Sequence, residues 1–154
     1  VLVPEGSLGS AQGLAASADG FVLFVADYTQ GIARVELSSG RVSFLETPER
    51  LLVAGVDGLV LAGDSLVAIQ NGLEPHRVLR LRLGEGGTRI LESTILERAH
   101  PRFDEPTLGV RVGAAFYYVA NSQYGAFRED GTIDEAQLRA PTVLRLPLPW
   151  VGDR

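Results

Sequence analysis

The sequence repeats itself in three units, and this repeat limits the possible folds more than any other feature. The units begin with the triplets QGL at 12–14, DGL at 57–59 and PTL at 106–108. A second set of equivalent triplets is VAD at 25–27, AIQ at 68–70 and VAN at 119–121. Asp27 and Gln70 lie 43 positions apart, and Gln70 and Asn121 lie 51 apart, because the third unit contains an inserted loop. The chain is therefore built from repeats of about 40–50 residues.

Apolar and polar residues alternate within each unit, and this pattern predicts strands and not helices. In the first unit Ala33, Val35 and Leu37 alternate with Arg34 and Glu36. Asp-Gly and Ser-Gly sequences separate the apolar runs, as expected for tight turns between strands. Four strands in each repeat of this length are typical of β-propeller blades. We therefore predict an all-β fold, a β-propeller fragment of about three and a half four-stranded blades.

The predicted blades occupy residues 10–50, 51–98 and 99–150, and residues 1–9 are expected to be the tail of a preceding blade. A closed propeller has about four to eight blades, which is more than 154 residues provide. We therefore expect the missing blades to come from a longer chain or from a second copy. The sequence starts with Val1 and contains no Met, which also indicates a fragment or a processed product. A short helix is expected only near residues 135–139, inside the insertion.

Composition excludes several classes of function. The net charge of −5 and the pI of about 5.0 argue against a nucleic-acid partner. The chain has no Cys, which excludes disulfides and thiolate chemistry. All fourteen basic residues are Arg, so no Schiff-base or P-loop lysine is present. No apolar run is long enough for a membrane helix and no signal-peptide pattern is present, so no membrane partner is expected and the compartment stays open.

The antiparallel order of the predicted strands gathers polar residues on one face. The start of each innermost strand and the end of each second strand must lie on that face. Asp57 is the central candidate there, as a ligand of a divalent cation or as a base. A turn aspartate that caps its own backbone before Gly58 is the alternative interpretation. The other candidates, for substrate binding, are Asn71, His76, Glu105, Asn121 and Tyr124.

The two histidines belong to loops of the same predicted face. His76 and His100 would suit general acid–base chemistry if carboxylates lie beside them. His100 precedes a proline, and Asp104 and Glu105 precede another, so a rigid surface loop explains these residues equally well.

The first two units also carry a family resemblance. The Gly-Leu entry at 13–14, the Ser-Ala-Asp-Gly hairpin at 17–20 and the Val-Ala-Asp-Tyr strand end at 25–28 resemble the senescence marker protein, gluconolactonase and luciferin-regenerating enzyme family. Propellers of the NHL type contain similar strings. The resemblance covers roughly residues 10–122 and implies a six-bladed propeller.

The resemblance implies a site as well as a fold. Gluconolactonase-like members hydrolyse lactones or esters with one divalent metal in the central channel. The resemblance places Asp57 at the position of an aspartate ligand, and Gln12 at the position of an asparagine ligand. A third ligand, a glutamate, would lie in a blade outside this sequence.

Two functions follow as expectations. The first is a metal-dependent hydrolase of a lactone or ester, with Ca²⁺, Mg²⁺ or Zn²⁺ held by Asp57 and Gln12. The alternative is a non-catalytic propeller that binds a small molecule or a protein on its loop-rich face. Two features favour this alternative: Gln12 stands where the family has an asparagine ligand, and the third unit has a long loop.

Overall fold

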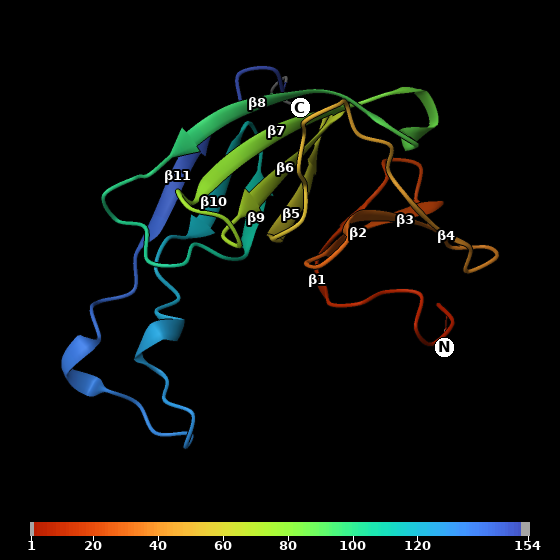
Figure 1. Cartoon of the computed structure of the whole chain (residues 1–154). Coiled ribbons are helices and arrows are strands. Elements are labelled where there is room, and N and C mark those ends of the chain that lie inside the picture. Colours follow the sequence, from red (N-terminus) through yellow and green to blue (C-terminus); the bar gives the residue numbers. More distant parts are fainter. Residues whose placement is uncertain (1, 152–154) are drawn as a thin grey trace.

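Residues 2–151 are described by the structure, a computed structural model, and they form three antiparallel sheets (Figure 1). The first sheet contains β1 (Ala11–Ala16), β2 (Val22–Asp27), β3 (Gly31–Glu36) and β4 (Val42–Phe44) in that order. The second contains β5 (Val56–Ala62), β6 (Ser65–Gln70), β7 (Arg77–Leu83) and β8 (Ile90–Arg98). The third contains β9 (Gly109–Val112), β10 (Ala115–Val119) and β11 (Val143–Pro147). Each strand pairs with its neighbour in sequence, which is the meander of a propeller blade.

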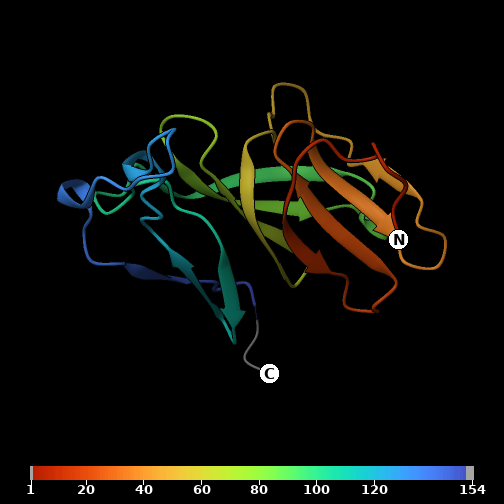
Figure 2. The same cartoon turned by 90° about the horizontal axis from the view of Figure 1, so that it is seen from below.

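The sheets lie side by side with their innermost strands, β1, β5 and β9, next to one another (Figures 1 and 2). The innermost strand β5 packs against β1 on one side and β9 on the other. The prediction of an all-β propeller fragment is therefore confirmed, with a three-stranded third sheet. The helix expected near residues 135–139 is one 3₁₀ turn, Glu135–Gln137. Two other 3₁₀ turns, Glu85–Gly87 and Tyr124–Ala126, lie in loops.

The apolar core fills the spaces between the sheets. Strand β6 is buried on both faces, because Leu66 and Ala68 contact the first sheet while Val67 and Ile69 contact the third. Side chains that alternate along a strand point to opposite faces, so one short apolar run can serve two interfaces. On the second interface the rings of Phe116 and Tyr118 stack, with centroids 5.3 Å apart.

The outer faces of the first and third sheets, which point away from the second sheet, differ in how far their apolar residues are covered. On the first sheet Val25, Ala33 and Val35 are buried, and the N-terminal segment covers them with Val3 and Leu8. On the third sheet four apolar residues of the corresponding face are more than half exposed. These residues are Leu108, Val110, Val112 and Val143. An apolar face of this kind normally marks an interface.

Candidate functional site

Two β-bulges create the site. The pairing of β1 with β2 breaks register between Ala11 and Leu14, and that of β5 with β6 breaks between Val56 and Leu59. Residues 12–13 and 57–58 lie at these breaks and are the equivalent pairs Gln-Gly and Asp-Gly of the repeat. A bulge changes the direction of a side chain relative to the regular ladder. The repeat therefore places the side chains of Gln12 and Asp57 at equivalent bulges of two neighbouring innermost strands.

The glycines of these bulges let the innermost strands approach each other. A Cβ atom on Gly13 would lie 2.4 Å from the carbonyl oxygen of Asp57, and one on Gly58 would lie 2.5 Å from that of Thr107. Neither distance leaves room for a methyl group, so the strands meet backbone to backbone. The two bulges therefore lie side by side where the innermost strands of the sheets meet.

The side chains that meet there line a polar pocket of about 220 Å³. The lining residues are Gln12, Tyr28, Asp57, Asn71, Glu105 and Tyr124. We call this the axial pocket. All three sheets or their loops contribute to it, and five of the six residues were candidates from the sequence. Their roles in binding or catalysis stay predictions, but the structure does bring them together.

Asp57 and Asn71 form the centre of the axial pocket. Asn71 Nδ2 donates to Asp57 Oδ2 over 2.9 Å and to the carbonyl oxygen of Pro106 over 3.0 Å. Burial raises the pKa of Asp57 above its usual range, although the hydrogen bond from Asn71 opposes the shift. The remaining amide oxygen, Asn71 Oδ1, is buried and accepts no hydrogen bond within residues 2–151. A buried oxygen without a donor suits a cation or a donor group of a ligand.

Tyr28 is the residue of this pocket that the sequence candidates omit. Its pKa is raised by burial and by the charges of Asp57 and Glu105, so its phenol stays protonated and can donate a hydrogen bond. The repeat could have identified it, because Tyr28 directly follows the triplet 25–27 as Asn71 follows 68–70. Equivalent positions of neighbouring blades point to the same axis.

Glu105 and Tyr124 come from the loops of the third unit. Glu105 has a left-handed backbone with φ of 56°, which is uncommon for a residue other than glycine. Ser122 Oγ donates to its carbonyl oxygen over 2.7 Å, and the amide of Gly125 donates to its carboxylate over 3.2 Å. These bonds hold Glu105 at the pocket. Tyr124 is 60% exposed at the mouth, where a ligand could cover its ring.

The other two predicted substrate-binding residues do not line the axial pocket. His76 is largely buried and lies 3.0 Å from the Glu74 carboxylate. Asn121 accepts a hydrogen bond from the amide of Thr142 over 2.7 Å and donates to the carbonyl of Ala140. Both side chains therefore hold loops in this structure.

The strand-end position that Asn121 occupies holds a buried polar residue that binds loop backbone in all three units. Asp27 accepts hydrogen bonds from Gly9 and Gln30, which together with Thr29 lower its pKa to about 2 despite burial. Gln70 donates to the carbonyls of Leu52 and Ala54 over 3.1 and 2.6 Å. In these two units the buried polar residue binds the backbone that enters the blade, and the next residue, Tyr28 or Asn71, lines the axial pocket. In the third unit Asn121 binds the backbone of the insertion instead.

The axial pocket offers oxygen donors only. They are two carboxylates, from Asp57 and Glu105, and two amides, from Gln12 and Asn71. Such a set suits Ca²⁺ or Mg²⁺, and it lacks the nitrogen and sulfur ligands that Zn²⁺ prefers. Across residues 2–151 no three His, Cys, Asp or Glu side chains lie close enough to hold a metal ion by themselves. Any cation here would therefore need the amide oxygens.

The raised pKa of Asp57 makes a prediction for stability. Because the folded pKa lies above the unfolded one, ionising Asp57 costs folding free energy at pH values above the folded pKa, and the cost disappears below the unfolded pKa near 3.9. We expect Asp57→Asn to be more stable than the parent at pH 7 and equal to it near pH 3, measured by urea unfolding. Asp64→Asn is the control with opposite sign, since hydrogen bonds from Ser65 and Arg80 lower the pKa of Asp64. A D57N variant that is less stable at pH 7 would contradict the interpretation.

Comparisons with known proteins support the fold. No protein-family model matches the sequence, and no curated protein matches it. Solved structures do match: a luciferin-regenerating enzyme has 18% identity and a TM-score of 0.61 over 96% of this chain and 48% of its own. The PQQ-bound aldose sugar dehydrogenase of Streptomyces coelicolor has 15% identity and a TM-score of 0.59 over 92% of this chain and 44% of its own. The apo aldose sugar dehydrogenase of Escherichia coli has 16% identity and a TM-score of 0.61 over 93% and 45%.

The chain thus spans about half the length of the solved proteins that it resembles. None of the helices described in residues 2–151 has the length and apolar character needed to cross a membrane. At these identities the likeness concerns the fold alone. The chain has the fold of part of a β-propeller, similar to that of luciferin-regenerating enzyme.

Proposed function

We propose that the axial pocket is the active site of a hydrolase that acts on a lactone or ester with the help of a divalent cation. The observation that supports this most is the buried, unpaired Asn71 Oδ1 beside the Asp57 carboxylate. Two further oxygen donors, from Gln12 and Glu105, line the same pocket. Ca²⁺ and Mg²⁺ are the cations that this donor set fits.

The residues of the chain suggest a division of work. Asp57, Gln12 and Glu105 would hold the cation together with Asn71 Oδ1. The Asn71 amide nitrogen would orient Asp57 through its 2.9 Å hydrogen bond. A bound cation would polarise the carbonyl group of the substrate and lower the pKa of water. Without a cation, burial raises the pKa of Asp57, and a bound cation would lower it and keep the carboxylate ionised as a ligand. The protonated phenol of Tyr28 would donate a hydrogen bond to a substrate oxygen.

The proposal also includes a further blade that covers the exposed face of the third sheet. The exposed apolar residues Leu108, Val110, Val112 and Val143 form a face that a neighbouring blade would bury. The similar solved propellers are about twice as long as this chain, which favours a further blade over a second copy as the occupant. A closed ring would also narrow the axial pocket.

Cation titration combined with an activity assay tests the proposal. We expect calorimetry to show one site for Ca²⁺ or Mg²⁺, and we expect hydrolysis of simple lactones or aryl esters to stop after treatment with EDTA and to return when the cation is added. Binding without hydrolysis of any ester or lactone would reject the hydrolase. Hydrolysis unaffected by chelation would reject the cation.

The alternative, a propeller that binds a small molecule without reaction, rests on a different observation. Gln12 Nε2 donates to Ser10 Oγ over 3.2 Å, and Tyr124 exposes its ring at the mouth. Amides and an aromatic ring are typical of binding sites for polar ligands. Ligand binding by the EDTA-treated protein, with no turnover, would favour this alternative.

A further inference from the structure

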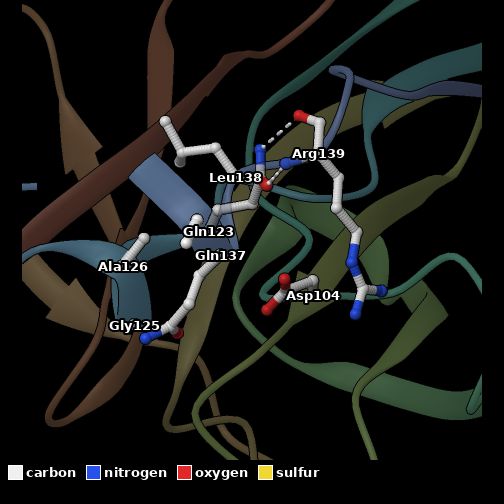
Figure 3. A pocket seen from close by; sticks show the side chains of 8 residues that line it. Asp104, Gln123, Gly125, Ala126, Gln137, Leu138 and Arg139 are labelled. Carbon is white, nitrogen blue, oxygen red and sulfur yellow. Dashed lines mark hydrogen bonds between the residues drawn. The ribbon is translucent and has the colours of Figure 1, made fainter. Parts of the chain in front are cut away.

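A second polar hollow lies on the loops of the third unit, away from the axis. It consists of two adjoining cavities of about 360 and 270 Å³ that share Asp104 and Arg139. The first lies between the 3₁₀ turns Tyr124–Ala126 and Glu135–Gln137 and contains Gln123 and Gln137 (Figure 3). The second adds Arg102 and the loop that enters the third sheet. We call the two cavities together the rim pocket.

The backbone of Arg139 is fixed by a buried glutamine. Gln123 Oε1 accepts a hydrogen bond from the Arg139 amide over 2.6 Å, and Gln123 Nε2 donates to the Arg139 carbonyl over 3.2 Å, as the dashed lines in Figure 3 show. Gln123 itself is buried and has a left-handed backbone with φ of 59°. An uncommon backbone that is held in this way is often found at binding sites. Arg139 thus projects from an anchored point of the loop.

The charges of the rim pocket are not balanced internally. In the part of the chain from residue 2 to 151, the guanidinium groups of Arg102 and Arg139 form no ion pair with a carboxylate. Asp104 is the one carboxylate among the residues that line either cavity, and the Arg139 side chain extends alongside it in Figure 3. The pocket therefore offers two arginine residues, both exposed, and one carboxylate. This arrangement suits an anion that also carries hydrogen-bond donors.

We propose that the rim pocket binds a small hydroxycarboxylate. Arg102 and Arg139 would hold the carboxylate, because a guanidinium group matches its two oxygens. Asp104 would accept hydrogen bonds from hydroxyl groups, and the Gln137 amide would provide further polar contacts. A phosphate would bind less well, since its second negative charge would lie beside the Asp104 carboxylate.

This site is separate from the axial pocket. The two share no lining residue, although Gly125 of the rim pocket donates to Glu105 of the axial pocket over 3.2 Å. The proposal does not depend on hydrolysis or on a cation. Its test can therefore fail while the proposed function holds, and the reverse is also true.

Three ligands with the same carbon skeleton test the chemistry. We expect glycerate to shift the amide resonances of residues 102–104 and 137–140 in an NMR titration, with the cation removed by EDTA. Glycerol lacks the carboxylate and propionate lacks the hydroxyl groups, so both should bind at least about tenfold more weakly. Phosphate is the fourth probe. Equal or tighter binding of phosphate, or no shift with glycerate, would overturn the proposal.

Substitutions that each remove one arginine charge then test which residues bind the carboxylate. Arg139→Gln and Arg102→Gln should each weaken glycerate binding by about ten- to a hundredfold, as expected for a lost hydrogen bond to a charged group. Arg111→Gln is the matched control, because Arg111 is exposed and donates to the carbonyl oxygen of Gly113 at the hairpin of the third sheet. An equal loss in R111Q would show that only net charge matters and would overturn the site.

Discussion

Gly58→Ala is expected to destabilise the protein by roughly 3 kcal/mol, at the upper end of the range for overpacking in a filled interior. The added methyl group would lie 2.5 Å from the carbonyl oxygen of Thr107 and 2.9 Å from Ile69 Cδ1. The Ile69 side chain can move only within its own packed interface, whereas the Thr107 oxygen belongs to the backbone and cannot turn away. Strand β5 would then have to separate from the third sheet. Urea unfolding followed by circular dichroism measures the change.

Gly125→Ala is the matched control for this prediction. A Cβ atom on Gly125 would meet no other atom within 4 Å, so this substitution adds the same methyl group in open space. It should leave stability unchanged or increase it slightly, because alanine restricts the unfolded chain. Equal effects of G58A and G125A would show that the close contact between the innermost strands is not required. The claim that glycine at this bulge is needed to bring the innermost strands together would then be wrong.

The repeat explains why so much of the fold was predictable. Turn sequences and alternation located the strands, because a propeller blade is a local meander in which each strand pairs with its sequence neighbour. The burial of both faces of β6 was less evident, since Leu66, Val67, Ala68 and Ile69 form a continuous apolar run. Such a run gives no periodicity from which two separate interfaces could be inferred.

Most of the site was predictable from equivalent positions of the repeat, and Tyr124 was predicted from the insertion. Asp57 and Gln12 were found because equivalent triplets of two units begin with them, and the structure places both in the axial pocket. His76 was chosen by its loop and face alone, and Asn121 by its place in the equivalent triplet 119–121. Whether a side chain at a strand end lines the axial pocket or binds loop backbone depends on a shift of one residue in the repeat, as Asn71 and Asn121 show. Sequence polarity does not distinguish these two positions.

The rim pocket could not have been predicted from the sequence. Its residues lie in the insertion and in the loop that enters the third unit, where no repeat equivalence exists. The hydrogen bonds between Gln123 and Arg139 join residues 16 positions apart across an irregular loop. Nothing in the pattern of apolar and polar residues encodes such a contact.

Asp57→Asn is expected to abolish cation binding and to reduce ester or lactone hydrolysis about a thousandfold. A cation supplies several kcal/mol of transition-state stabilisation, and about 1.4 kcal/mol corresponds to a tenfold change in rate. The substitution keeps the shape of the side chain and an oxygen that can accept the Asn71 hydrogen bond, so the pocket should stay folded. Calorimetry with Ca²⁺ or Mg²⁺ and initial rates under saturating cation measure the two losses. Glu129→Gln is the control, since it removes one exposed carboxylate of the third-unit loop outside the axial pocket.

The two effects expected for this substitution have opposite signs, and this makes the test strict. At pH 7 and without the cation, the D57N variant should gain stability, because burial raises the pKa of Asp57 and the charge is costly there. The same variant should lose cation binding and activity. A residue whose charge destabilises the fold but is required at a pocket is typical of a functional site, where stability is exchanged for function. If D57N instead loses stability and keeps its activity, Asp57 is a structural turn residue and the axial pocket is not a hydrolase site.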